Sequence, residues 1–105
     1  MVQNKLYKVQ ISEEAQRGLG RIVSFVALNS IQAARVLKKD IIAEISSLKM
    51  FPERTPFLEG EFIPFNKYHK LVDRRNYLVI YQIKDDTVFV NYVIDCRQDY
   101  EWLIR

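Results

Sequence analysis

Hydrophobic residues in the first half of the chain follow two different periods. Apolar and polar residues alternate over 6–11, which predicts a half-buried strand. In two later stretches, 15–26 and 34–48, apolar residues recur every three or four positions, as on one face of an amphipathic helix. Ser12 precedes the first stretch and Ser30 the second, and each supplies an N-cap oxygen. The pattern therefore predicts a strand followed by two helices in an antiparallel hairpin.

Two glycines interrupt the first helical stretch. Gly18 and Gly20 each cost about 1 kcal/mol relative to alanine in a helix interior. We therefore expect tertiary packing to compensate for them.

The segment 52–64 holds three prolines, Gly60 and three glutamates, which favours an irregular connection over a third helix. It is nevertheless too hydrophobic for a solvated linker. Four of its apolar side chains are candidates for contact with a partner: Phe57, Leu58, Phe62 and Ile63. The alternative is that these side chains cover one end of the core.

Three strands are predicted in the rest of the chain. Residues 67–72 are moderately strand-like, whereas 77–83 and 88–94 are rich in β-branched and aromatic residues. Asp85-Asp86 provides a turn of hairpin length between the last two. The order is β-α-α-β-β-β, which predicts one α+β domain over 1–105, with the helical hairpin packed on an antiparallel sheet.

The amino-acid composition bears on where in the cell the protein is expected. The chain has 105 residues, 49% of them hydrophobic, and charged residues interrupt every apolar run before it reaches the roughly 20 residues that span a bilayer. We expect no membrane segment. A lone cysteine, Cys96, and the absence of a signal-peptide pattern predict a cytoplasmic protein. The net charge of +3 is small, but residues 66–84 are locally basic.

Metal and cofactor chemistry have little support in the sequence. One histidine, one cysteine and scattered acids give no ligand pair at zinc spacing, and the three glycines form no phosphate-binding loop. Cys96 is expected to fill apolar space rather than to act as a nucleophile. We therefore expect neither a metal site nor a bound cofactor.

Basic and aromatic side chains are the remaining candidates for chemistry. Such groups bind phosphates, stack on bases and stabilise the charge of a phosphoryl-transfer transition state without a metal. The alternative is that they form the solvent face of the sheet, and strand alternation places Lys67 and His69 on the face opposite Lys70. The candidates for nucleic-acid binding are Lys67, Lys70, Arg74 and Arg75.

Four segments in order resemble the RelE/ParE superfamily of bacterial toxins, also described as plasmid stabilisation proteins. They are Tyr7-Lys8-Val9 leading into Ser12-Glu13-Glu14-Ala15, Ser47 to Arg54, Tyr68 to Tyr81, and Asp86-Thr87-Val88 followed by Val93 to Tyr100. The resemblance implies a growth-inhibiting toxin of a type II toxin-antitoxin module, neutralised by a cognate antitoxin encoded beside it. If such an antitoxin binds this chain, the four apolar loop residues named above are candidates to form part of its groove, because they exceed what anchoring the loop requires.

The resemblance leaves the target open between DNA gyrase and ribosome-bound mRNA. RNA-cleaving relatives tend to carry an arginine where this chain has Leu78, and lysines where it has His69 and Leu71. These departures, together with the Phe-Pro-Glu-Arg end of the helical hairpin, favour inhibition of gyrase.

The alternative is a metal-independent, ribosome-dependent endoribonuclease. In that case the catalytic residues would be His69 as general acid or base, Arg97 as charge stabiliser and Tyr100 as its partner. A third hypothesis is an inactive family member that only binds antitoxin, so the sequence does not decide whether the protein is an enzyme.

Overall fold

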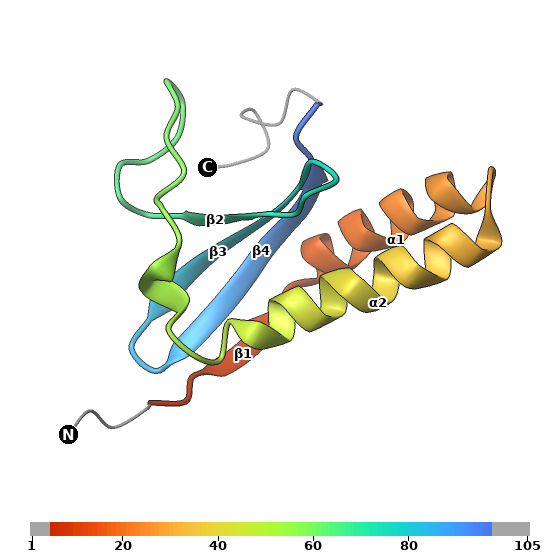
Figure 1. Ribbon diagram of the computed structural model, residues 1–105. Coiled ribbons are helices and arrows are strands. Elements are labelled where there is room, and N and C mark those ends of the chain that lie inside the picture. The colour runs from red at the N-terminus through yellow and green to blue at the C-terminus, as the bar shows by residue number, and fades with distance from the viewer. Residues whose placement is uncertain (1–4, 98–105) are drawn as a thin grey trace.

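The computed structural model describes residues 5–97. Figure 1 shows two long helices on one side of a twisted sheet. In chain order the elements are β1 (Lys8–Ile11), α1 (Glu13–Ala27), α2 (Ile31–Ser47), the 3-10 helix η1 (Pro52–Arg54), β2 (His69–Val72), β3 (Tyr77–Lys84) and β4 (Thr87–Asp95). The predicted α+β fold with a helical hairpin on a sheet is confirmed, and the two long C-terminal strands differ from prediction by one residue at each end at most.

The sheet has the strand order β1-β4-β3-β2 and is mixed. Strands β2, β3 and β4 are antiparallel as predicted, but β1 pairs parallel with β4, so the prediction of a wholly antiparallel sheet is wrong at this edge. The reason lies at the start of α1. The Ser12 backbone N–H donates to the Val90 carbonyl at 2.9 Å and the Ser12 hydroxyl donates to the Asn91 carbonyl at 2.9 Å. These bonds tie the end of β1 to β4 and fix its direction.

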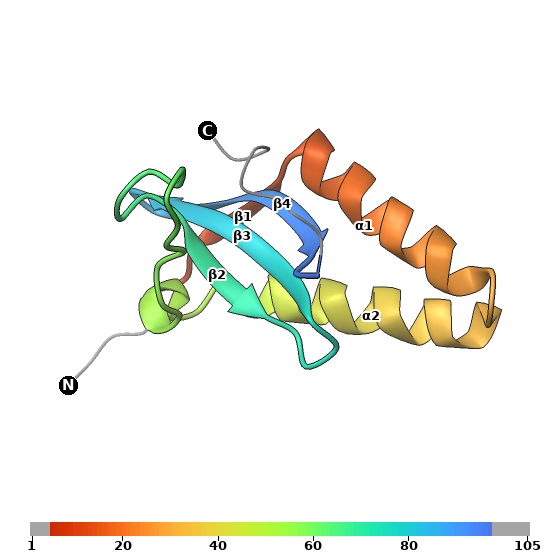
Figure 2. The same cartoon turned by 90° about the horizontal axis from the view of Figure 1, so that it is seen from above.

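The helices pack on one face of the sheet, and Leu58, Ile63 and Tyr68 of the loop that precedes β2 pack on the other (Figure 2). On the helical face the buried core contains Ala15, Leu37, Ile41, Ile45, Leu48, Tyr77, Val79, Tyr81, Val88, Val90 and Val93. On the other face a smaller cluster contains Leu58, Ile63, Tyr68, Leu78, Ile80 and Ile94, with Cys96 packed against it. The prediction that Cys96 fills apolar space is therefore confirmed.

Both helices begin where the sequence predicts. The Ser12 and Ser30 hydroxyls accept hydrogen bonds from the backbone N–H groups of Ala15 and Ala33, respectively, at 3.0 Å each. Within α1, Gly18 is buried against the backbone of Val93, so packing explains this glycine. Gly20 is exposed, and nothing lies within 4 Å of a Cβ built on it, so the prediction that packing compensates for it is wrong.

A bulge in β4 decides which of its side chains face the helices. Tyr81 pairs with Val90 whereas Ile80 pairs with Tyr92, so Asn91 is an extra residue in β4. Val90 and Val93 consequently both enter the helical core, although their spacing of three does not fit simple alternation.

Among residues 5–97, no helix combines the length and the apolar character that a membrane crossing requires.

Candidate functional site

His69 is enclosed at the start of β2. Its ring is 8% exposed and stacks between Phe57 and Tyr81, with ring centroids 4.4 Å and 5.4 Å away. Its Nδ1 lies 3.0 Å from the Thr55 carbonyl oxygen, and because a carbonyl only accepts, Nδ1 carries the hydrogen. The imidazole therefore ties the loop to the sheet with one of its two nitrogen atoms.

The Tyr81 hydroxyl forms hydrogen bonds with the same part of the loop, residues 52–55. It donates to the Pro52 carbonyl at 2.6 Å and lies 2.5 Å from the Thr55 hydroxyl, which donates to it in turn. Burial raises the pKa of Tyr81 above its ordinary value, which keeps the hydroxyl protonated. Together, His69 and Tyr81 fasten residues 52–55 to the sheet.

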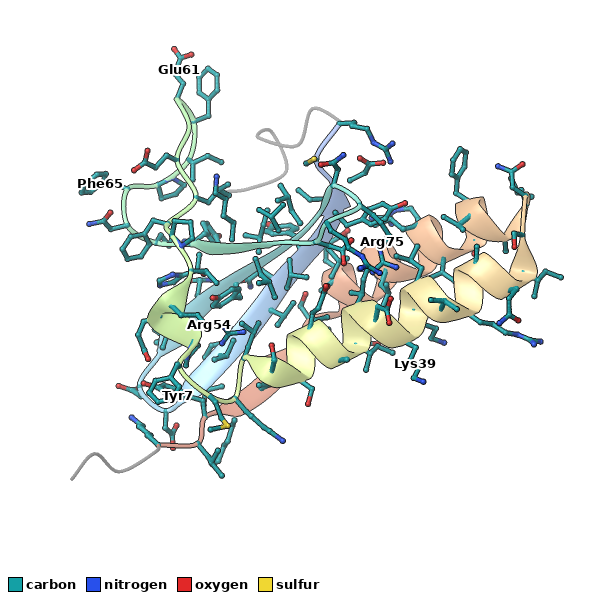
Figure 3. All side chains as sticks on the ribbon, viewed as in Figure 1. Tyr7, Lys39, Arg54, Glu61, Phe65 and Arg75 are labelled. Atoms are coloured by element: carbon teal, nitrogen blue, oxygen red, sulfur yellow. The ribbon has the colours of Figure 1, made fainter. Side chains whose placement is uncertain are left out.

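Arg54 closes the C-terminus of α2 (Figure 3). Its Nη1 donates to the carbonyls of Met50 at 2.7 Å and Phe51 at 3.2 Å, and its Nη2 donates to the Ser47 hydroxyl at 2.9 Å. These groups lie where the helix leaves carbonyls without intrahelical donors. The Phe-Pro-Glu-Arg segment therefore has a structural role in ending α2, whatever its part in function.

Arg97 lies far along the sheet from His69. Register places His69 opposite Tyr81 and Asp95 opposite Tyr77, an offset of four residues or roughly 13 Å along β3 at about 3.3 Å per residue. Arg97 follows Asp95, and its guanidinium donates to both oxygens of that carboxylate at 2.8 Å and 2.7 Å. This contact raises the pKa of Arg97 and lowers that of Asp95. The structure does not bring His69 and Arg97 together, and Tyr100 lies outside the described residues.

The four predicted nucleic-acid-binding residues do not share one surface. Lys67 is exposed ahead of β2, with its Nζ 5.2 Å from the centre of the Tyr68 ring. Lys70 is half-buried opposite Ile80, on the face away from the helices, and Arg74 is exposed in the turn between β2 and β3. The predicted alternation of His69 and Lys70 is confirmed, but β2 begins only at His69, so Lys67 lies before the strand and its predicted place on the His69 face is not.

Arg75 is bound to carboxylates that sequence reasoning did not single out. Its Nε and Nη2 donate to the two oxygens of Asp73 at 2.9 Å and 2.8 Å, and its Nη1 lies 3.1 Å from Asp40 on α2. Figure 3 shows Arg75 beside α2. Hydrogen bonding from Arg75 holds the pKa of Asp73 well below its ordinary value, and the pKa of Arg75 is raised in return. The sequence feature that could have pointed to an ion pair here is the presence of two acids, Asp40 and Glu44, one turn apart on a predicted helix.

The four loop residues divide into two pairs. Leu58 and Ile63 are buried in the smaller cluster, which matches the alternative that they cover part of the core. Phe57 is 37% exposed and Phe62 is 71% exposed. Two of the four side chains are therefore accessible in this structure, and their role in partner binding stays a prediction.

An open groove of about 490 Å³ between the two helices was not predicted. Its apolar lining comes from both helices and from β4, and Lys38 is a charged residue of the lining. The sequence feature that could have predicted this groove is the presence of further apolar residues, such as Val23 and Ile42, beside the apolar face of each predicted helix. The lining includes Ala15, Leu19, Val23, Ile42, Ile45 and Val93.

Across the part of the chain that the structure describes, no three His, Cys, Asp or Glu side chains are grouped so that they could hold a metal ion.

Two solved structures share the architecture of this chain. The chain matches the solved structure of the chromosomal ParDE system from P. aeruginosa with a TM-score of 0.71 at 14% identity, covering 87% of this chain and 97% of that one. A conserved hypothetical protein from Helicobacter pylori matches with a TM-score of 0.57 at 16% identity, covering 89% of this chain and 98% of that one. At these identities the two structures show the fold alone. No curated protein sequence matches the chain.

The sequence itself supplies the family. Residues 9–100 match the family described as the ParE toxin of the type II toxin-antitoxin system parDE. The chain belongs to this ParE toxin family, which confirms the resemblance seen in the sequence.

Proposed function

We propose that this chain is a toxin that inhibits DNA gyrase and is neutralised by a cognate antitoxin encoded beside it. Membership of the ParE toxin family supports the toxin role and the antitoxin partner. The choice of gyrase over RNA rests on the arrangement of His69 and Arg97.

Metal-independent RNA cleavage needs preorganised cations and an acid or base around one phosphate. Here His69 is buried between two aromatic rings, and Arg97 is held by Asp95 about four residues further along the sheet. Leu78, where RNA-cleaving relatives tend to carry an arginine, is buried in the smaller cluster. The single observation that carries the proposal is this separation of the two best catalytic candidates.

The target can be tested with purified toxin in two parallel assays. We expect the toxin to inhibit DNA supercoiling by gyrase and to leave mRNA intact in a translating ribosome mixture. Antitoxin added in equal amount should restore supercoiling. Intact supercoiling together with cleaved mRNA would overturn the proposal.

The ribonuclease alternative is favoured by one observation, the exposed cations Lys67 and Arg74 on either side of β2. If mRNA is cleaved, His69→Ala and Arg97→Ala variants, shown to be folded, identify whether these residues carry the activity. Inactivity in both assays and harmless expression in cells would instead favour a family member that only binds antitoxin.

We also propose that Phe57 and Phe62 contact the antitoxin, while Leu58 and Ile63 hold the loop that presents them. Exposed aromatic side chains on a supported loop are frequent anchors at protein interfaces. Figure 3 shows Glu61, the residue before Phe62 in the sequence, on a loop that extends away from the sheet.

Phe62→Ala tests this surface, with Phe25→Ala as a matched control because both phenylalanines are 71% exposed and Phe25 lies on α1. We expect Phe62→Ala to weaken antitoxin binding at least tenfold in a calorimetric titration and Phe25→Ala to leave it unchanged. Equal affinities for the parent and both variants would contradict the assignment.

A further inference from the structure

One carboxyl oxygen of Glu44, a half-buried residue on α2, is itself buried without a hydrogen-bond partner. Among the described residues, Glu44 Oε2 is the one buried side-chain polar atom that neither donates nor accepts a hydrogen bond. A charged oxygen in that position has lost its water and gained no donor, which is costly. A proton on this carboxyl removes the cost.

The neighbour of Glu44 is a second carboxyl, that of Asp73 in the turn between β2 and β3. Two ionised carboxylates have no hydrogen between them, so their contact becomes a hydrogen bond only when one is protonated. Asp73 is 1% exposed and accepts three hydrogen bonds from Arg75, from its backbone N–H, Nε and Nη2. Because these donors stabilise the charged form of Asp73, the proton belongs to Glu44.

The charges around this pair support the same assignment. Asp40 comes from α2, and Asp73 and Arg75 come from the turn; these are the groups that act on Glu44. With Glu44 protonated, two carboxylates face one guanidinium, and ionisation of Glu44 adds a third. The added charge would have no new cation to pair with.

We propose that Glu44 and Asp73 share one proton, carried by Glu44, and that this proton fastens α2 to the β2–β3 turn until the pH rises through neutrality. The fastening joins residues 29 positions apart in the sequence, alongside the ion pair of Arg75 and Asp40. When the proton leaves, Glu44 and Asp73 repel each other and the turn that displays Arg74 loosens from the helix.

The sign of the pH dependence follows from linkage. Burial is the largest cause that raises the pKa of Glu44 from 4.5 to about 7, and the hydrogen bond with Asp73 is the next. The folded protein therefore holds the proton more tightly than the unfolded chain does. Stability from this proton is fully present below pH 4.5 and is lost as the pH rises through about 7.

Glu44→Gln tests the proposal because the amide is nearly the same shape and can donate to Asp73 at every pH. The melting temperature of the parent should fall between pH 6 and pH 8.5, and that of Glu44→Gln should fall by less. Glu13→Gln is the matched control, since Glu13 is a helical glutamate whose side chain is 88% exposed, and it should follow the parent. Equal pH dependence in the parent and Glu44→Gln would overturn the proposal.

Two NMR measurements decide the matter even if the variant does not fold. In the parent, the Glu44 side-chain carboxyl carbon should titrate with a midpoint near 7, and the amide signals of residues 73–76 should shift over the same range. A Glu44 carboxyl that is already ionised at pH 6 would refute the shared proton.

Discussion

Gly18 allows α1 to approach the sheet more closely than any other residue would. A Cβ at this position would lie 2.2 Å from the Val93 carbonyl oxygen and 3.3 Å from its carbonyl carbon. Both atoms are backbone in β4, where Val93 pairs with Val79 of β3, so they cannot move aside as a flexible side chain would. Gly18→Ala therefore requires α1 to move away from β4 by roughly 1 Å, since a carbon and an oxygen that are not bonded to each other seldom approach closer than about 3.2 Å.

The expected cost combines two opposing effects. Alanine stabilises the helix by about 1 kcal/mol relative to glycine, whereas overpacking of this kind costs typically about 1–3 kcal/mol and more when backbone must move. The displacement also separates Ala15 and Leu19 from the core they contact. Because backbone must move, the overpacking cost falls in the upper part of this range, and after the helix gain we expect Gly18→Ala to lower the free energy of unfolding by about 1–2 kcal/mol, or the melting temperature by roughly 4 °C per kcal/mol.

Gly20→Ala is a control within the same helix. Nothing lies within 4 Å of a Cβ built at Gly20, so this variant should gain the helix propensity of alanine, about 0.5–1 kcal/mol. Urea unfolding followed by circular dichroism measures both variants against the parent. If Gly18→Ala is as stable as the parent, or if Gly20→Ala is clearly less stable, the account of close helix–sheet packing is wrong.

Three further predictions concern the residues that hold the loop and the turn. Tyr81→Phe removes the hydroxyl that donates to the Pro52 carbonyl and should lower the free energy of unfolding by about 1–3 kcal/mol, measured by urea unfolding; no change would show that the carbonyl finds another donor. Arg54→Lys keeps the charge but loses the forked contacts at the end of α2, and we expect a loss of about 1 kcal/mol; a stability equal to the parent would mean that charge alone suffices. The lowered pKa of Asp73 means that its stabilising charge is present above its ordinary pKa of 3.8 and is lost as the pH falls below that value. Asp73→Asn should therefore flatten the decline in melting temperature between pH 5 and pH 2, and an unchanged slope would contradict this account.

Much of the fold follows from features that act over a few residues. The N-caps Ser12 and Ser30, the turn at Asp85-Asp86 and the β-branched and aromatic residues of the last two strands all predict elements that the structure contains. These signals work because a cap, a turn or a strand face is determined by neighbouring side chains and backbone geometry. The ordered set of such segments was also enough to recognise the toxin family.

The candidate site was less accessible to sequence reasoning. His69 looked like a general acid or base because its residue type permits that role, but its enclosure by Phe57 and Tyr81 depends on a loop that folds over the strand. Arg75 looked like a nucleic-acid contact because it lies in a basic segment. Its actual partners are Asp73, two residues away, and Asp40, 35 positions earlier on α2.

The sequence by itself determined which residues form helices and strands, where the helices start, and which family the chain resembles. Tertiary structure alone decided the parallel direction of β1, the bulge that places Val93 against Gly18, and the contact between Glu44 and Asp73. The physical reason is that alternation and caps reflect local geometry, whereas strand direction and buried pairs depend on which distant segments share one core.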